Sequence, residues 1–384
     1  MSPLLRIGCI FNEGGDMRTG TFQEDFFHDT QVIPGLLTST GAGDISERVF
    51  SNVDMVDLDA YDKVVAFLSG GKDSVSMILK LIDAGIDLSK VEAWHHSVDG
   101  RESDGNFMDW PCVEDYCVKL CEALGIPVYF SWLKGGFKGE MLKENAISQP
   151  HIIETPTGIK VLERNAKSSK KATRLMFPQQ SASLATRWCS SALKIDVARR
   201  GLSNQDRFNH SNILVISGER REESANRAKY YQLEPHRSDA RVAKRTQRHI
   251  DHWRPVLNWS EADVWTSMEK HGILAPVPYR LGLGRSSCQF CIFSSDRIWA
   301  TMRHYFPTRF QEIADLENRF GVTINRSKLS VSQLADNAKP IEVDDPSALA
   351  QAMSTEYTLP IFADSDNPWF EPMGAFSSES CGSY

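Results

Sequence analysis

The hydrophobic pattern of residues 61–132 predicts strands and helices in alternation. Residues 63–68 form a short apolar run with β-branched side chains, which is typical of a buried strand. After a glycine pair, apolar side chains recur at the i, i+3, i+4, i+7 spacing of one buried helix face: Val75, Ile78, Leu79 and Ile82. Gly85 then provides a helix stop. The first unit is therefore predicted to be a strand, a glycine loop and a helix.

Further strands are predicted at 91–96, 128–132 and 213–217. Strands that alternate with helices form parallel sheets, because the chain must cross a face of the sheet between them. We therefore expect an α/β fold, with a twisted parallel sheet and helices on both faces. Ligands bind such sheets at the carboxyl ends of the strands.

Changes in polarity divide the chain into a core and additions. Residues 1–60 are expected to form an N-terminal extension, and 61–275 the sheet domain. An insertion is expected at about 135–186. A cysteine-containing helical region follows at 276–340, and 341–384 is polar enough to predict a flexible tail.

The overall composition is that of an ordinary globular protein, with 384 residues, 41% hydrophobic and 24% charged. No run of 18 apolar residues exists, so no membrane association is expected. Without a clear signal-peptide cleavage site, the protein is interpreted as cytoplasmic. The eight cysteines are then not expected to form a disulfide framework. A homo-oligomer is left open.

Charge is distributed unevenly along the chain. Residues 151–260 contain 21 Lys and Arg against 10 Asp and Glu, whereas the whole chain has a net charge of −7. A basic block inside an acidic chain indicates an anionic ligand. A nucleotide would suffice, and a nucleic acid is an alternative.

The glycine pair lies in a hexapeptide at the junction of the first strand and helix: Ser69, Gly70, Gly71, Lys72, Asp73 and Ser74. Glycine lets backbone N–H groups close on an anion, and the helix N-terminus adds about half a positive charge. The Walker pattern is not met, because Lys72 is followed by Asp73 and has no glycine five residues before it. The alternative is a plain turn with Asp73 as a helix cap.

The strand predicted at 213–217 leads into a second candidate motif, with Gly218 followed by Arg220, Arg221 and, further on, Arg227. Guanidinium groups bind phosphate or sulfate bidentately. Interleaved glutamates could hold the arginines or bind Mg²⁺. A solvated helix face is the alternative, but the position opposite a phosphate loop favours ligand binding.

Together these motifs resemble a known superfamily. The hexapeptide is similar to the PP-loop, S-G-G-x-D-S, of the ATP pyrophosphatases, which have an adenine nucleotide alpha-hydrolase-like fold. The arginine run and the segment 253–265 resemble the phosphoadenylyl-sulfate (PAPS) reductase family within it. The likeness covers about residues 60–300. It implies that 61–275 is a nucleotide-binding domain and that ATP is cleaved between its α and β phosphates.

The resemblance also implies roles for particular residues. The loop, Gly218 and Arg227 would bind Mg²⁺-ATP, with Lys72 stabilising the departing pyrophosphate and Asp73 helping to hold Mg²⁺. Arg220 and Arg221 would meet the α phosphate or the substrate. The acceptor, an unidentified oxyanion or carbonyl compound, would be adenylylated, and sulfur transfer would follow.

Three cysteines are candidate metal ligands. Cys288 and Cys291 form a C-x-x-C, and Cys189 lies in a W-C-x-x-x-L-K pattern that ends at Lys194. Several members of the family bind a [4Fe–4S] cluster with such residues. A zinc site, a redox pair and structural thiols are the alternatives.

Some features depart from the family. True PAPS reductases have a Phe in the loop in place of the Gly-Lys-Asp pattern kept here, and use a cysteine in a terminal Glu-Cys-Gly-x-His segment that Cys381 matches only partly. The small subunit of ATP sulfurylase lacks the C-x-x-C. A reductase, a sulfate adenylyltransferase and an ATP-binding, DNA-associated accessory protein therefore remain as alternatives.

Overall fold

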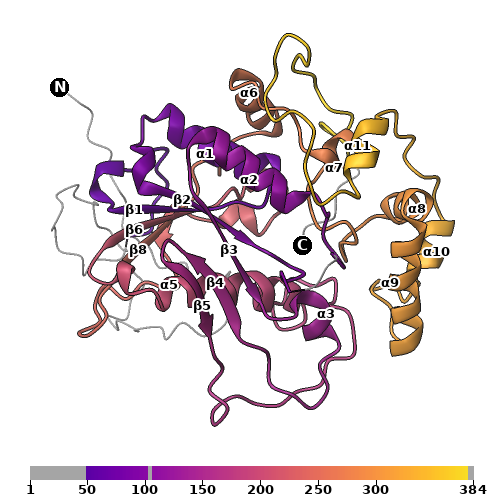
Figure 1. The fold of residues 1–384 in the computed structure, drawn as a ribbon, viewed down its shortest axis with the longest axis horizontal. Coiled ribbons are helices and arrows are strands. Elements are labelled where there is room, and N and C mark those ends of the chain that lie inside the picture. The colour runs from indigo at the N-terminus through magenta and orange to yellow at the C-terminus, as the bar shows by residue number, and fades with distance from the viewer. Residues whose placement is uncertain (1–48, 103–105, 379–384) are drawn as a thin grey trace, which may run out of the picture.

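A single eight-stranded sheet organises the molecule, in a computed structural model that describes residues 49–102 and 106–378 (Figure 1). The strand order is β5-β4-β3-β2-β1-β6-β8-β7. The strands are β1 (Lys63–Phe67), β2 (Val91–His96), β3 (Val128–Leu133), β4 (His151–Thr155), β5 (Gly158–Leu162), β6 (Asn212–Ile216), β7 (Leu233–Pro235) and β8 (His249–Trp253).

The central strands are parallel, as predicted. β1 pairs in parallel with β2 and β6, β2 with β3, and β6 with β8. Towards the two edges of the sheet, β4, β5 and β7 run antiparallel to their neighbours. Part of the expected insertion at 135–186 thus extends the sheet, since the hairpin of β4 and β5 turns at 156–157 and pairs with the end of β3.

Helices cover both faces of the sheet, which confirms the α/β prediction (Figure 1). They are α1 (Lys72–Asp83), α2 (Val113–Leu124), α3 (Gly136–Met141), α4 (Trp188–Ser190), α5 (Asp196–Ser203), α6 (Glu261–Lys270), α7 (Val277–Arg280), α8 (Asp296–Tyr305), α9 (Pro307–Phe320), α10 (Val331–Asp336) and α11 (Pro346–Gln351). A π-helical turn, η3 (Ser191–Ile195), joins α4 to α5.

The alternation of side chains in β1 explains this layering. Val64 packs into the large core cluster that includes residues of α1 and α2. Val65 points the other way, into a second cluster with Trp94 and with Leu202 of α5. Gly201 allows the close approach of α5, because a Cβ there would lie 2.9 Å from a ring atom of Trp94.

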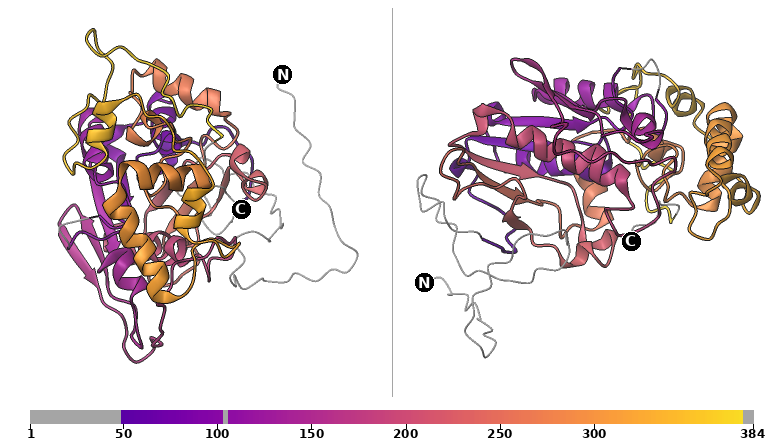
Figure 2. Two further views of the ribbon diagram at one scale, coloured as in Figure 1. Left: turned by 90° about the vertical axis from the view of Figure 1, so that its right-hand side faces the viewer. Right: turned by 90° about the horizontal axis from the view of Figure 1, so that it is seen from below.

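The sequence predicts a flexible tail at 341–384; in its described part, through residue 378, the chain forms α11 and buries Tyr357. Helices α8, α9 and α10 lie beside the sheet, and α11 packs near α7 (Figure 2). Tyr357 is buried, its N–H donates to Asp115 of α2 at 2.6 Å, and its carbonyl accepts from Lys119 at 2.5 Å. A few well-placed apolar and backbone groups are therefore sufficient to dock a polar segment.

The N-terminal extension is described only from residue 49. Ser51 forms an antiparallel bridge with Leu233 of β7, and Val56 is buried in the core. Across residues 49–102 and 106–378, none of the helices combines the length and the hydropathy needed to cross a lipid bilayer.

Candidate functional site: a phosphate loop beside a recessed group of thiols

The glycine loop lies between β1 and α1, as predicted. Gly70 has φ +77°, a left-handed conformation, and a Cβ there would lie 2.9 Å from Val113. Ser74 Oγ donates to the carbonyl of Gly71 at 2.8 Å and accepts from the N–H of Ser69 at 3.2 Å. The N-cap residue of α1 is Gly71, which has no side chain to accept from the first N–H groups of the helix. The loop therefore presents a helix N-terminus suited to an anion.

Lys72 is the buried cation of this loop. It is 2% exposed, and its Nζ lies 3.4 Å from Asp73 and 3.4 Å from Glu261. The backbone N–H of Lys72 donates to the hydroxyl of Tyr279 at 3.1 Å. Burial opposes the charge, but attraction to Tyr279, Asp73 and Glu261 raises the pKa of Lys72. The ammonium group is thus held charged and close to the start of α1.

The second predicted motif meets the loop directly. Arg220 Nε lies 2.5 Å from Asp73 Oδ1, and its Nη1 donates to Glu222 at 2.6 Å. Burial opposes ionisation of Asp73, but Lys72 and Arg220 lower its pKa. Gly218 lies against the loop so closely that a Cβ would be 2.5 Å from the carbonyl oxygen of Asp73. The structure therefore brings Gly218, Asp73 and Arg220 together.

The remaining predicted arginines have other contacts. Arg221 donates to Asn258 at 2.7 Å and to Asn52 at 2.8 Å, on the outer side of this segment. Arg227 forms an ion pair with Glu223. Burial lowers the pKa of Arg227, but the attraction of Glu223 and Glu219 is stronger, and the net result is a raised pKa. The structure does not bring Arg221 to the loop.

The three predicted thiols gather around Lys194. Burial and the neighbouring Cys291 raise the pKa of Cys189 to about 11, while Lys194 lowers it. Desolvation by the surrounding protein lowers the pKa of Lys194, but the attraction of Cys288, Asp109 and Cys189 outweighs this effect and raises the pKa. Lys194 is exposed and the three thiols are partly buried, so the thiols lie beside a cation near the surface.

This arrangement does not match a preformed metal site. Within residues 49–102 and 106–378, no group of three or more His, Cys, Asp or Glu side chains is placed to hold a metal ion. Burial raises the pKa of Cys288 well above its usual range, which favours the thiol in the protein without a metal. The cysteines as placed therefore do not fit an iron–sulfur cluster or zinc, and the metal assignment stays a prediction from the sequence.

Several neighbours of these groups did not stand out in the sequence. Glu261 lies within the segment 253–265 without a signal of its own, and its ion pair with Lys72 joins positions 189 residues apart. Asp109, which lies near Lys194, belongs to no motif. Lys194 itself carried a signal, since it ends the W-C-x-x-x-L-K pattern.

A carboxylate after β2 anchors the neighbouring loop. Asp99 Oδ2 accepts from the N–H groups of Phe107, Met108 and Asp109 at 2.8–2.9 Å, whereas Oδ1 is buried and has no partner among the residues of known position. Burial raises the pKa of Asp99 to about 6 despite these donors. The residue positions the segment that carries Asp109.

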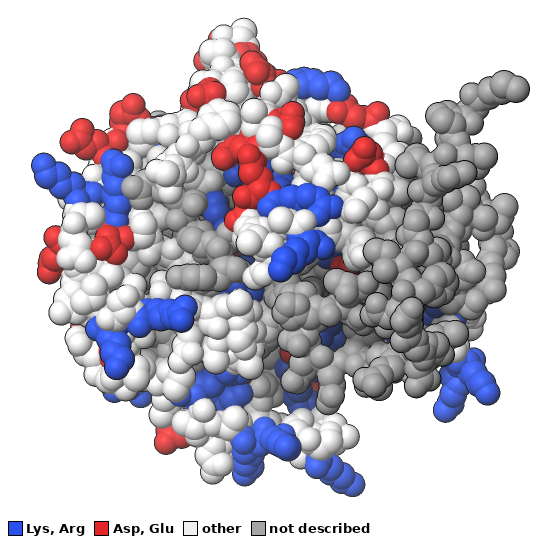
Figure 3. Space-filling model, turned by 180° about the vertical axis from the view of Figure 1, so that it is seen from behind, with Lys and Arg blue, Asp and Glu red and all other residues white. Residues whose placement is uncertain are grey.

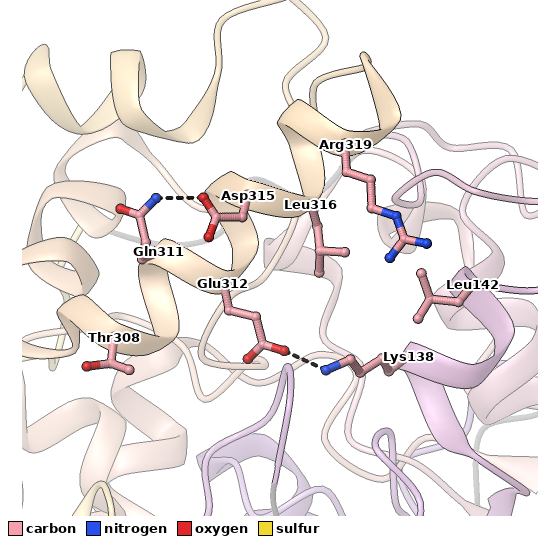
Figure 4. A pocket seen from close by; sticks show the side chains of 8 residues that line it. All are labelled: Lys138, Leu142, Thr308, Gln311, Glu312, Asp315, Leu316 and Arg319. Atoms are coloured by element: carbon pink, nitrogen blue, oxygen red, sulfur yellow. Dashed lines mark hydrogen bonds and ion pairs between the residues drawn. The ribbon is translucent and has the colours of Figure 1, made fainter.

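An open groove lies elsewhere in the described part of the molecule. It has a volume of about 670 Å³ and lies between α3 and α9, where Lys138 and Glu312 point toward each other at 2.6 Å (Figure 4). It contains none of the predicted site residues.

Residues 153–285 match the family model of the phosphoadenosine phosphosulfate reductase domain. Over this segment the chain is similar to that family. The match confirms the resemblance inferred from the motifs, and it includes Cys189, Lys194, Arg220 and Tyr279. It begins after the glycine loop and ends before the C-x-x-C, so it does not test those two motifs.

Two curated relatives have no known function. The chain is 26% identical over 142 residues to an uncharacterized protein of Escherichia phage 186, covering 37% of this chain and 40% of the relative. It is 25% identical over 135 residues to an uncharacterized protein of Methanocaldococcus jannaschii, covering 35% of this chain and 30% of the relative. The chain thus spans less than half the length of either relative.

Solved structures give weak likenesses. Candida glabrata FMN adenylyltransferase in complex with FMN and the ATP analog AMPCPP has a TM-score of 0.35 and 11% identity, covering 82% of this chain and 81% of that one. A second structure of this enzyme has a TM-score of 0.29 and 10% identity, with coverages of 78% and 75%. At these scores the likeness carries no argument.

Proposed function

We propose that this protein is an ATP-dependent enzyme that binds Mg²⁺-ATP at the loop 69–74 and transfers AMP to an oxyanion or carbonyl acceptor. The observation that carries the proposal is the buried Lys72 at the N-terminus of α1, next to the pair of Asp73 and Arg220. The loop sequence and the matched reductase domain support the same assignment.

The loop would contribute to catalysis mainly by electrostatic stabilisation. Backbone N–H groups and Lys72 would stabilise the charge that collects on the departing pyrophosphate. Arg220 would meet the α phosphate. Asp73 would release either Lys72 or Arg220 in order to bind Mg²⁺. The ion would offset negative charge on the phosphates. No general base is needed if positioning and charge suffice.

The thiols suggest a second step. Once the acceptor is adenylylated, a sulfur nucleophile could displace AMP from it. Lys194 would favour the thiolate form of Cys189, whose high pKa otherwise keeps it protonated. This assignment of sulfur transfer rests on the gathering of Cys189 and Cys288 around Lys194.

Calorimetry tests the first step. Mg²⁺-ATP and a non-hydrolysable analogue should bind the wild type, and the double variant Lys72→Ala, Asp73→Ala should lose that heat while Lys270→Ala, an exposed lysine on α6, keeps it. Where turnover is measurable as pyrophosphate release, loss of Lys72 should lower kcat by about 10²–10³. Equal binding by wild type and double variant would refute the proposal.

A PAPS reductase is the second candidate, because the matched domain carries that description. It would require Cys381, which lies outside the described residues. Reduction of PAPS by the wild type and its loss in Cys381→Ser would favour this function over adenylyl transfer.

A further inference from the structure

A group of arginines on α5 and its surroundings has no role in the site described above. Arg164 follows β5, Arg199 and Arg200 lie on α5, and the three repel one another electrostatically. Arg237 lies within range of Arg199. On the face shown in Figure 3, basic side chains predominate in the lower half, whereas acidic ones gather above.

Carboxylates do not balance this group. Asp196 lies 3.5 Å from Arg199, and Glu163 is in range of Arg200. Glu140, the other acid near Arg164, is already bound by Lys143 and Arg174. The guanidinium groups of Arg164, Arg199 and Arg200 therefore face two available carboxylates, which leaves a surplus of positive charge that an anion would offset.

Two buried hydrogen-bond donors in the same group lack acceptors. Arg164 Nη2 donates to His151 Nε2 at 3.0 Å, so the proton of this histidine is on Nδ1. His151 is 0% exposed, and its Nδ1 has no partner among residues 49–102 and 106–378. Arg200 donates through Nη2 to the carbonyl of Glu163 at 2.9 Å, but its buried Nη1 is likewise unpaired there.

Burial and mutual repulsion also lower the pKa of Arg164 and Arg200, so a bound anion would relieve an unfavourable concentration of charge. Guanidinium groups satisfy phosphate oxygens in pairs. We propose that Arg164, Arg199 and Arg200 form a binding site for a phosphate group of the acceptor substrate, separate from the phosphate loop.

The position of α5 links this site to the thiols. Lys194 and Arg199 lie on one continuous run of helix, η3 and α5, and five residues of α-helix span about 8 Å. Five residues also turn the helix by about 140°, so only an acceptor long enough to pass around it would bring its far end to Cys189 and Cys288. The assignment to the acceptor rests on the proposed function, but phosphate binding itself does not.

The test uses the full-length chain and three probes: inorganic phosphate, AMP and a fluorescently labelled single-stranded oligonucleotide. Titrations are made in the Lys72→Ala, Asp73→Ala background, so that the loop does not contribute. Adding Arg199→Ala and Arg200→Ala should weaken phosphate binding by about tenfold or more. The control, Lys138→Ala with Arg319→Ala, removes the same charge at the groove of Figure 4 and should change nothing.

The probes distinguish two sources of the phosphate. If a free nucleotide is the ligand, AMP binds the arginine site with an affinity similar to that of the oligonucleotide. If a nucleic-acid strand is the ligand, the oligonucleotide binds far more tightly, and the salt dependence of log K loses about one unit of slope for each arginine removed. Either result supports the site.

Unchanged binding in the arginine variant, or binding of none of the probes, would overturn the proposal. Arg199→Lys with Arg200→Lys guards against misfolding, since it keeps the charge and should recover part of the affinity. Failure of the ATP assignment would appear separately, as absence of Mg²⁺-ATP binding in the wild type with phosphate binding at the arginines intact.

Discussion

The Nε atom of Arg220 lies 2.5 Å from Oδ1 of Asp73, although 147 positions separate the two residues in the chain. Arg220 follows β6 and Asp73 opens α1, so this ion pair joins the two parallel strands β1 and β6 at their carboxyl ends. It links the two motifs that the sequence indicated as phosphate-binding, and it is the contact on which the proposed site depends.

Arg220→Ala should destabilise the fold as well as the site. Asp73 would keep its ion pair with Lys72 but lose the closer one with Arg220. A largely buried carboxylate that loses a hydrogen-bond donor lowers the free energy of unfolding by about 1–3 kcal/mol. Urea denaturation should show this loss, and calorimetry should show weaker Mg²⁺-ATP binding. Arg303→Ala removes an exposed partner of Asp336 and serves as the control. Equal stability of Arg220→Ala and wild type would contradict the role of the pair.

Gly218→Ala should disturb the loop without changing any charge. The added Cβ would lie 2.5 Å from the backbone oxygen of Asp73, and backbone cannot move aside cheaply. Overpacking of this kind costs about 1–3 kcal/mol. We expect a lower urea midpoint and weaker Mg²⁺-ATP binding. Gly139→Ala in α3, where the nearest atom would be 3.9 Å away, should be neutral. If both variants behave alike, Gly218 is not required.

Asp99 should make stability depend on pH in an unusual direction for a carboxyl group. Its pKa rises from 3.8 to about 6 on folding, so the folded chain holds the proton more tightly. Its contribution is therefore full below pH 3.8 and is lost as pH rises through about 6. The total change is about 3 kcal/mol. Unfolding free energies of wild type and Asp99→Asn, measured at intervals from pH 4 to 7, should differ by an amount that falls with pH. A constant difference would exclude the shift.

Lys194→Gln should make Cys189 less reactive. The lysine lowers the pKa of this thiol against the effect of burial, and each added pKa unit reduces the thiolate fraction about tenfold below the pKa. Alkylation by iodoacetamide at pH 8, followed by mass spectrometry of the Cys189 peptide, should be slower. Lys270→Gln on the exposed face of α6 is the matched control. An unchanged rate would place Lys194 outside the reach of the thiol.

Much of the framework could be read from local patterns. The apolar run before Ser69 and the helical spacing after it predicted β1 and α1, because burial of a strand or helix face leaves its period in the sequence. The antiparallel edge strands were harder to predict. β5 is mostly exposed, so its residues do not alternate between buried and exposed positions as those of a core strand do. The docking of 341–378 was missed because it depends on a few contacts, such as that of Tyr357 with Asp115.

The sequence by itself determined the α/β class, the glycine loop between β1 and α1 and the identity of the charged and sulfur-containing side chains, since these follow from local spacing and residue type. Only the tertiary structure decided which of them meet. It joined Asp73 to Arg220 and Lys72 to Glu261, turned Arg221 toward Asn258, and gathered Cys189 and Cys288 around Lys194. Such pairings depend on the spatial order of the strands in the sheet and on how the helices pack across it. Neither property can be read from one short segment of sequence.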